Sequence, residues 1–281
     1  TTNIMFWKIR KNISDQYLVS IGAGFNQIPL IQEAKKLGFH IIGVDNNALA
    51  PGFLLCDLKI QESIENYNEI FKKLRELLIA GEINAVMTKS YGFAIKTASF
   101  LAEKFNLPFL SFETSEFFIN KKKMKHVFQT ANILSPELLT YSSEKSFKKL
   151  EKNIPLIVKP TVGHAKIDIK KLDTIKDLKQ TMKKFASEKT KIIFEPYIEG
   201  DEIIVAGIIN NNEYHLVNIS DKIRAELPYF SDLKHISPSK YIHLFDKIAE
   251  VGQKVADNFS ITTSPLIMEF IVDKDENLYL I

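Results

Sequence analysis

The sequence predicts a two-domain α/β protein, in which a parallel, doubly wound sheet is followed by an α+β domain with antiparallel strands. The chain has 281 residues, which is enough for two ordinary domains. Apolar strands alternate with amphipathic helices up to about residue 112, and beyond it the strands come in adjacent pairs. We therefore expect one domain over residues 1–113 and a second over residues 114–281.

The first domain begins with a strand–helix–strand unit. An apolar strand is predicted at Tyr17–Ile21, and Gly22 and Gly24 follow it in the turn to a helix. Gly38 marks the end of this helix, and a second strand is expected at His40–Val44. A strand, a helix and a strand of these lengths form one parallel crossover.

The same alternation continues to the end of the first domain. Apolar residues recur at helical spacing over residues 64–78, and Gly81 lies just past them. The strand Ile83–Met87 follows, then a helix that starts after Gly92, and finally a short apolar strand at Leu107–Leu110. Strands and helices in this order predict a parallel sheet.

The second domain combines helices with paired strands. A lysine-rich helix is expected at Asn120–Ala131 and an amphipathic helix at Tyr241–Asn258. Asn210–Asn212 predicts a hairpin turn, because asparagine tolerates the left-handed backbone conformation that such turns need. The predicted strands are Pro155–Lys159, Lys191–Glu195, Glu202–Ile209, Tyr214–Ile219, Pro265–Val272 and Asn277–Ile281.

Charge and hydropathy exclude several classes of protein. The 37 basic and 34 acidic side chains leave a formal net charge of only +3, too small an excess to indicate a nucleic-acid partner. No apolar run approaches the ~18 residues that cross a bilayer, so no membrane partner is expected. The single cysteine, Cys56, cannot form an intrachain disulfide, which is typical of a reducing compartment. We therefore expect a cytoplasmic protein.

Gly22, Gly24 and Asp45 form part of a dinucleotide-binding pattern. In that pattern, glycines let a pyrophosphate approach a helix, and an acid after the second strand holds a ribose. The third glycine is missing, and Gln27 takes its place. We therefore prefer a structural role for the turn, with Asp45 as a cap or a cleft residue, and keep an NAD-binding oxidoreductase as an alternative.

Three segments of the second domain carry residues suited to a nucleotide. Lys159 ends a strand before a loop with Gly163, where an ammonium group and backbone amides can hold phosphate oxygens. In EPYIEGDE, Glu195–Ile198 can offer its backbone to an adenine edge, and Glu202 can accept ribose hydroxyls. Glu269 lies between two apolar residues and so faces away from them, where it can bind Mg²⁺. Taken singly, each segment also fits a plain strand end or hairpin.

The order of these segments resembles the ATP-grasp superfamily, and in particular carboxylate–amine ligases similar to the large chain of carbamoyl-phosphate synthase. The resemblance covers most of the chain. GAGFNQIPLIQEAKKLGFHIIGVDNNALAPG resembles the family's leading domain, NKKKMKHVFQTANILSP the helix that opens the ATP region, and DKIRAELPYFSDLKHISPS a substrate-side segment. The fold implied is a Rossmann-like, parallel-sheet pre-ATP-grasp domain followed by an α+β ATP-grasp domain.

The resemblance implies a role for individual residues. Lys121 and Lys159 would contact the phosphates of ATP, together with the loop that contains Gly163. Glu195, Tyr197 and Ile198 would hold the adenine, mostly through backbone atoms.

The remaining roles concern the ribose, the metal ion and the second substrate. By the same resemblance Glu202 would hold the ribose, and Glu269 would match the first Mg²⁺-binding carboxylate. Arg224 is our candidate for a catalytic, anion-holding side chain, because a guanidinium group binds a carboxylate in a bidentate manner.

The implied reaction phosphorylates a carboxylate with ATP and Mg²⁺, and an amine or thiol then captures the acylphosphate. The expected partners are therefore small-molecule carboxylate and amine substrates, with a homodimer as a further option. The enzyme would act by positioning and by neutralising charge.

Two features depart from the family pattern. The phosphate loop is usually rich in glycine and serine, whereas here Gly163 is followed by the bulky His164, Lys166 and Ile167. The family also expects an E-x-N-P-R segment after the final strand, and the chain ends at Ile281. We therefore expect an ATP-grasp domain that is incomplete at its C-terminus. A catalytically weak or inactive nucleotide-binding protein of the same fold remains an alternative.

Overall fold

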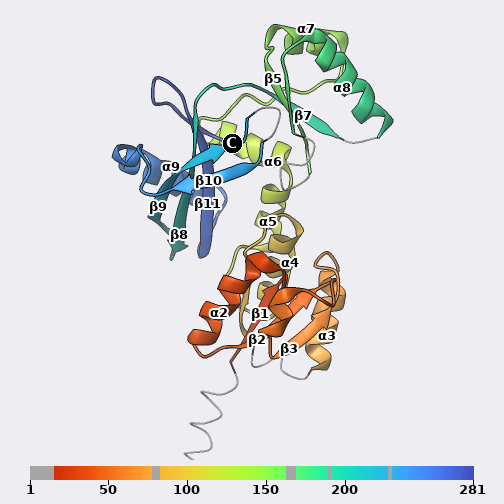
Figure 1. Cartoon of the computed structure of the whole chain (residues 1–281), viewed down its shortest axis with the longest axis vertical. Helices are drawn as coiled ribbons and strands as arrows, with labels where there is room; N and C mark the ends of the chain where they lie inside the picture. The colour runs from red at the N-terminus through yellow and green to blue at the C-terminus, as the bar shows by residue number, and fades with distance from the viewer. Residues whose placement is uncertain (1–15, 78–82, 163–168, 189–190, 227–229) are drawn as a thin grey trace, which may run out of the picture. The chain divides into compact units, whose positions relative to one another are not determined.

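The computed structural model describes residues 16–77, 83–162, 169–188, 191–226 and 230–281. The chain forms two compact units, Thr1–Ile119 and Asn120–Ile281 (Figure 1). The helix α5 (Phe112–Ile119) lies wholly in the first unit, so the observed division comes six residues after the one expected from the sequence. In the described part of the chain, no helix is both long and apolar enough to cross a membrane.

The first unit contains a four-stranded parallel sheet with the strand order β3-β2-β1-β4. Its strands are β1 (Tyr17–Ile21), β2 (His40–Asp45), β3 (Leu58–Gln61) and β4 (Ile83–Met87). Its helices are α2 (Ile28–Lys36), α3 (Tyr67–Glu76), α4 (Phe93–Lys104) and α5, with 3₁₀ turns η1 (Phe25–Gln27) and η2 (Pro51–Leu54). The predicted parallel sheet is confirmed, and Gly81, the predicted helix stop, lies outside the described residues.

Helices cover both faces of this sheet. Leu18 and Ile41, on one face, pack against Ile31 of α2. Val19 and Ile42, on the other face, pack in a core that includes apolar residues of α3 and α4. The central strands β1 and β2 are apolar at consecutive positions because they are buried on both sides, as in a doubly wound fold. The edge strand β3 instead alternates buried Ile60 with exposed Lys59 and Gln61.

The glycine turn after β1 is held by side chains of the protein itself. Gly22 has a φ of +95°, a conformation that glycine adopts without strain. The Asp45 carboxylate accepts hydrogen bonds from the backbone N–H groups of Ala23 and Asn47, both at 2.9 Å. Buried Gln27 donates to the hydroxyl of Ser90. These bonds favour the structural role of the turn over a dinucleotide site, because Asp45 already caps the loop.

The predicted strand at Leu107–Leu110 is wrong. Leu107 follows Asn106, whose φ of +55° ends α4, and Pro108 has no N–H to pair with a neighbouring strand. Leu107 and Phe109 pack against the first unit's core, so their apolar character reflects burial in a loop. The strand β3 and the helix α5 are further elements that the sequence pattern did not predict.

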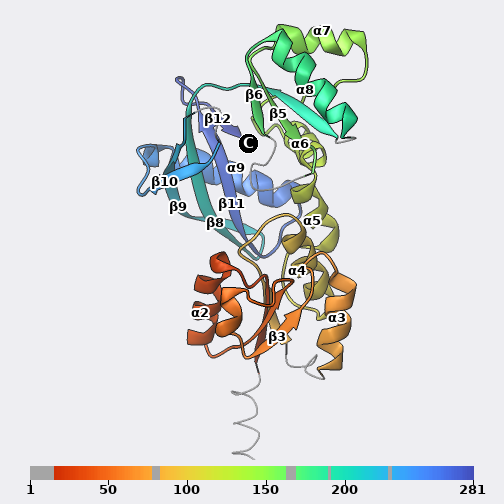
Figure 2. The same cartoon turned by 45° about the vertical axis from the view of Figure 1, so that its right-hand side comes forward.

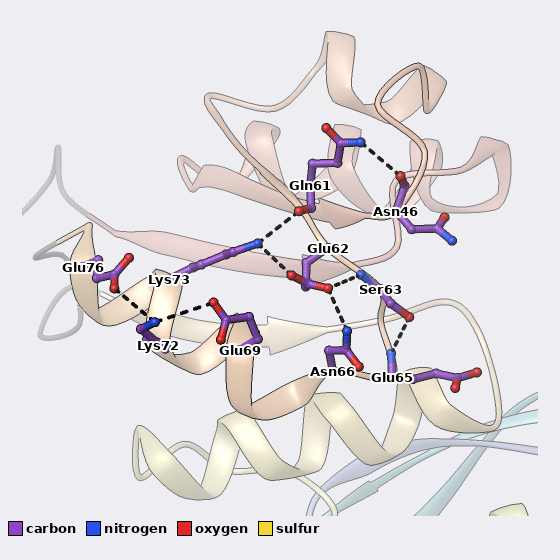
Figure 3. Close-up of polar contacts among 10 residues, drawn as sticks. All are labelled: Asn46, Gln61, Glu62, Ser63, Glu65, Asn66, Glu69, Lys72, Lys73 and Glu76. Atoms are coloured by element: carbon purple, nitrogen blue, oxygen red, sulfur yellow. Dashed lines mark hydrogen bonds and ion pairs between the residues drawn. The ribbon is translucent and has the colours of Figure 1, made fainter.

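A glutamate organises the connection between β3 and α3 (Figure 3). The Glu62 carboxylate accepts hydrogen bonds from the Ser63 backbone N–H at 2.9 Å and from the Asn66 side chain at 2.8 Å. It also accepts one from the Lys73 ammonium at 2.7 Å. Lys73 and these other donors lower the pKa of Glu62 to about 2. A single carboxylate thus joins the end of β3 to the body of α3.

The second unit contains two antiparallel sheets. The smaller sheet, of order β6-β5-β7, is covered by α7 and α8, whose apolar residues share its core (Figure 2). Its elements, with the helix α6 that precedes them, are α6 (Lys121–Thr130), α7 (Glu144–Lys152), β5 (Leu156–Pro160), β6 (Lys170–Leu172), α8 (Ile175–Ser187) and β7 (Ile192–Pro196). The lysine-rich helix and the strands at 155–159 and 191–195 are confirmed within one residue at each end, whereas α7, α8 and β6 were not predicted.

The larger sheet has the order β10-β9-β8-β11-β12 and carries the helix α9. Its elements are β8 (Asp201–Asn210), β9 (Glu213–Arg224), β10 (Asp232–Ile236), η3 (Ile242–Leu244), α9 (Phe245–Asn258), β11 (Ser264–Val272) and β12 (Leu278–Leu280). Asn211 and Asn212 have φ values of 50° and 68°, which confirms the predicted asparagine turn. Tyr214 packs so closely against Gly207 and Gly252 that a Cβ at either glycine would overlap its ring.

Candidate active site

A group of lysines surrounds one glutamate where α6 meets β5 and β7. The Lys159 ammonium lies 2.8 Å from Oε2 of Glu195, and the Lys125 ammonium lies 3.4 Å from Oε1. Lys125 also donates to the backbone carbonyl of Pro136 at 3.4 Å. The side chains of Lys125, Lys159 and Glu195 are only 1%, 11% and 4% exposed. We call these three residues, together with Lys121, the lysine cluster.

The local sequence of α6 explains how two lysines reach this cluster. The Asn120 side chain caps the helix by accepting hydrogen bonds from the backbone N–H groups of Lys122 and Lys123. Lys121 and Lys125 are four residues apart in the helix, so they lie on the same side of it.

The strand pairing explains the other two members. Ile157 of β5 lies opposite Glu195 of β7, and Lys159 is two residues further along β5. Residues two apart in a strand face the same side, so Lys159 is a diagonal neighbour of Glu195. The backbone N–H of Lys121 donates to the carbonyl of Thr161 at 2.9 Å and attaches the start of α6 to the chain just after β5.

Burial makes the positive charge of this cluster costly. Burial is the main reason that the pKa of Lys125 falls to about 8; Glu195 opposes the fall and Lys159 adds to it. Burial also lowers the pKa of Lys121, with a further contribution from Lys159. An anion bound here would favour the protonated lysines, because a nearby negative charge stabilises an ammonium group. The cluster is therefore suited to holding phosphate oxygens.

A second group of charges lies on the larger sheet and centres on Lys222. The Lys222 ammonium donates to the Glu269 carboxylate at 2.6 Å and lies 3.4 Å from Glu202 and 3.5 Å from Asp232. The Arg224 guanidinium lies 2.7 Å from the other oxygen of Glu202. The Lys222 side chain is fully buried, whereas that of Glu269 is 34% exposed. We call these five residues the carboxylate cluster.

The register of the sheet brings three of these residues to one face. Glu202 of β8 lies opposite Lys222 of β9, and it also lies opposite Ile271 of β11. Glu269 is two residues from Ile271 in the same strand, so it faces the same side as Glu202 and Lys222. This face is the one opposite to the buried apolar residues Ile203 and Phe270.

The connection between β7 and β8 contains the residues expected to hold an adenine. The backbone N–H of Tyr197 donates to the carbonyl of Pro155 at 2.9 Å, so this amide is used within the protein. The Lys171 ammonium lies 4.5 Å from the centre of the Tyr197 ring. Ile198 is partly buried and follows directly. Gly163, the expected loop residue, lies outside the described residues.

The structure thus divides the expected site residues between two clusters. Lys121, Lys159 and Glu195 come together in the first, and Glu202, Arg224 and Glu269 come together in the second. Arg224, expected to hold a substrate anion, is paired with Glu202 instead of standing alone.

Sequence reasoning missed three charged residues of these clusters. Lys125 could have been found from its spacing of four from Lys121 on one helix. Lys222 alternates with Arg224 along one strand, which indicates a common face. We find no signal in the sequence that would have picked out Asp232.

The residues present fit a magnesium ion only if the phosphates of a bound nucleotide complete its coordination sphere. Among the described residues, no group of three or more His, Cys, Asp or Glu side chains is placed to hold a metal ion. Glu269 offers a partly exposed carboxylate beside the ammonium of Lys222. Mg²⁺ is commonly bound by one or two carboxylates, water and the phosphates of a substrate, so a single such side chain is compatible with it.

Comparison with known proteins gives the same family that the motifs indicate. Residues 152–281 match the ATP-grasp domain family. The D-alanine–D-alanine ligase of Aquifex aeolicus is 23% identical over 191 residues, which are 66% of this chain and 65% of that protein.

Solved structures agree with this match. The L-amino acid ligase of Bacillus licheniformis has a TM-score of 0.75 at 22% identity, over 95% of this chain and 66% of that one. The biotin carboxylase domain dimer of Hydrogenobacter thermophilus 2-oxoglutarate carboxylase, solved with MgADP and bicarbonate, has a TM-score of 0.77 at 18% identity, over 95% and 63%.

The chain spans less than two thirds of the length of each of these three proteins. The narrower resemblance to the carbamoyl-phosphate synthase large chain stays a prediction. The matched residues include Lys159, Glu195 and Glu202, which anchor the two charge clusters. Residues 152–281 therefore belong to the ATP-grasp domain family, and the chain has the fold of ATP-grasp ligases.

Proposed function

We propose that the protein is an ATP-dependent ligase that joins a carboxylate to an amine, or to a thiol, through an acylphosphate. The observation that carries this proposal is the sharing of Glu195 by two buried ammonium groups, those of Lys125 and Lys159. One carboxylate cannot neutralise two ammonium groups, so the pair favours an anionic ligand. The family match and the fold support ATP as that ligand.

In this proposal the nucleotide binds along the segment that runs from β7 to β8. Lys159 and Lys121 hold its phosphates, with the loop around Gly163 beside them. The backbone of Ile198 binds the adenine edge, because the Tyr197 amide is already bonded to a carbonyl. Glu202, at the start of β8, accepts the ribose hydroxyls.

The carboxylate cluster would serve the metal ion and the reacting group. When bound, Mg²⁺ would neutralise phosphate charge, and Glu269 is the carboxylate that would hold it. Lys222 keeps Glu269 in place through its hydrogen bond. Arg224 would hold a substrate anion if the substrate can compete with Glu202 for its guanidinium.

The proposed chemistry has two balanced steps. A carboxylate oxygen of the first substrate attacks the terminal phosphorus of ATP, and ADP leaves. The amine then attacks the acyl carbon, inorganic phosphate leaves, and the amine loses a proton. The two substrate classes, a homodimeric state and a cytoplasmic location stay predictions.

A nucleotide-binding protein without turnover is the second candidate. It is favoured by the pairing of Arg224 with Glu202 and of Lys222 with Glu269, which leaves these side chains engaged with one another. This alternative predicts binding of MgATP without release of ADP.

Thermal-shift and calorimetric titration with MgATP, MgADP and NADH test the proposal. We expect both adenine nucleotides to raise the melting temperature, because a ligand that binds only the folded state stabilises it. Lys159→Ala should weaken MgATP binding by roughly 10- to 100-fold, the cost of one charge-assisted phosphate contact. Lys149→Ala removes an exposed lysine of α7 and is the matched control that should bind normally.

Three outcomes separate the candidates. ADP release that depends on an added carboxylate and an amine supports the ligase. Nucleotide binding without ADP release under any substrate mixture supports the second candidate. A response to NADH alone would revive the oxidoreductase alternative and remove the basis of the ATP site.

A further inference from the structure

Lys125 is a buried lysine to which the proposed nucleotide site assigns no direct contact. Its side chain is 1% exposed, so it is closed off from solvent. Its ammonium reaches the Glu195 carboxylate at 3.4 Å and the carbonyl of Pro136 at 3.4 Å. A lysine is rarely buried this far without a specific electrostatic task, because removing its charge from water is expensive.

The task follows from the way Glu195 is shared. Its Oε2 is 2.8 Å from Lys159, and its Oε1 is 3.4 Å from Lys125. A carboxylate between two ammonium groups holds each of them less strongly than it would hold one alone, because the two cations repel each other. The charge on Lys125 therefore controls how firmly Glu195 retains Lys159.

We infer that Lys125 is a positioning residue, which neutralises Glu195 so that the Lys159 ammonium is available to the phosphates of the nucleotide. This inference rests on the proposed nucleotide site and adds a residue that does not itself touch the ligand. Without Lys125, the buried Glu195 carboxylate would hold the Lys159 ammonium more strongly, and a phosphate would have to compete with Glu195 for it.

The same geometry couples nucleotide binding to the protonation of Lys125. The charged groups that act on Lys125 are Glu195 on β7 and Lys159 on β5, and the centre of the Phe128 ring lies 5.9 Å from its ammonium. Lys121 lies one turn away on the same side of α6. Burial lowers the pKa of Lys125 to about 8, so near pH 8 a large part of it is neutral. Phosphates bound at Lys159 add negative charge nearby and raise this pKa. Nucleotide binding near pH 8 should therefore take up a proton.

Isothermal titration of MgADP and MgATP at pH 8, in two buffers of different ionisation enthalpy, measures this proton directly. We expect the wild-type protein to take up about half a proton more than Lys125→Arg, whose guanidinium stays charged throughout. Protons released or taken up by the phosphates themselves cancel in this difference. Lys125→Arg should retain most of the affinity, because it preserves the charge beside Glu195.

A second variant tests the positioning role through affinity. Lys125→Met removes the charge at similar length and should weaken MgADP binding by roughly 10- to 100-fold. Lys149→Met, an exposed lysine on α7, is the matched control and should bind as the wild type does. Adenosine, which has no phosphates, should bind Lys125→Met and wild type equally and take up no proton.

The outcomes are decisive in both directions. Equal proton uptake by wild type and Lys125→Arg, or unchanged MgADP affinity of Lys125→Met, overturns the inference while the nucleotide site stands. Failure of the wild type to bind either nucleotide overturns the proposed function and this inference with it. If Lys125→Met does not fold, the difference in proton uptake between wild type and Lys125→Arg decides alone.

Discussion

Lys222 shows how a single residue can hold several charges in place. Its ammonium contacts Glu269, Glu202 and Asp232, which come from β11, β8 and β10. Burying an ammonium costs several kcal/mol in real proteins, and the nearby carboxylates offset that cost. Removing Lys222 would leave Glu202, which is nearly buried, with Arg224 as its remaining counter-ion among the described residues.

At the residue scale we therefore predict a large effect of Lys222→Met on folding. The variant should lose about 3 kcal/mol of unfolding free energy in urea denaturation, because the buried Glu202 carboxylate loses one of its cationic partners. Lys240→Met, which breaks the exposed pair with Asp201, should lose less than about 1 kcal/mol.

A double variant gives a sharper result. Combining Lys222→Met with Glu269→Gln removes both sides of the 2.6 Å contact, so part of the lost stability should return. Strictly additive losses from the two substitutions would show that Lys222 and Glu269 are not coupled.

The Glu62 carboxylate holds the start of α3 in place. Glu62 joins the end of β3 to Asn66 and Lys73, so the position of α3 depends on the ionised form of one side chain (Figure 3). The pKa of Glu62 lies at about 2 in the folded protein and near 4.5 when unperturbed. A lowered folded pKa means that the ionised carboxylate contributes stability above pH 4.5 and loses that contribution as the pH falls through 2.

At the element scale we predict that Glu62→Gln reduces stability most above pH 4.5. The difference in unfolding free energy between wild type and variant should shrink as the pH falls from 4.5 towards 2, because protonated Glu62 no longer stabilises α3. Urea denaturation at several pH values measures it. Glu76→Gln, on the exposed end of α3, is the control, and an equal pH dependence for both variants would contradict the role of Glu62.

The elements also show where sequence periodicity works and where it does not. Long amphipathic helices such as α4 and α9 were predicted because their apolar residues recur at helical spacing. Leu107–Leu110 was wrongly predicted as a strand, since a short apolar run looks alike in a strand and in a buried loop. The short strands β3 and β6 were missed, because three or four residues carry too little pattern to stand out.

For the whole molecule, every residue assigned to the nucleotide lies in the second unit. The first unit has its own core, built on both faces of its parallel sheet. We predict that MgADP slows hydrogen exchange in α6, β5, β7 and β8, while β1 and β2 exchange as in the free protein. Ligand binding protects the amides whose opening would lose the bound ligand. Equal protection of β1 and β7 would contradict this assignment.

The sequence by itself determined the fold class and the order of the nucleotide motifs. Glycine turns, helical spacing and the series of Lys159, Glu195, Glu202 and Glu269 are local features, and each can be recognised within one element. They suffice to indicate the ATP-grasp family, which residues 152–281 match.

Only the tertiary structure decided which charges meet. Lys125 of α6 contacts Glu195 of β7, and Lys222 bonds Glu269 at a separation of 47 residues. Local sequence patterns indicate on which face of a helix or strand a side chain lies. The residue that this side chain contacts depends on how distant elements pack and on how much water that packing excludes. For this reason the pairing of Lys125 with Glu195 and that of Lys222 with Glu269 became visible only in the folded chain.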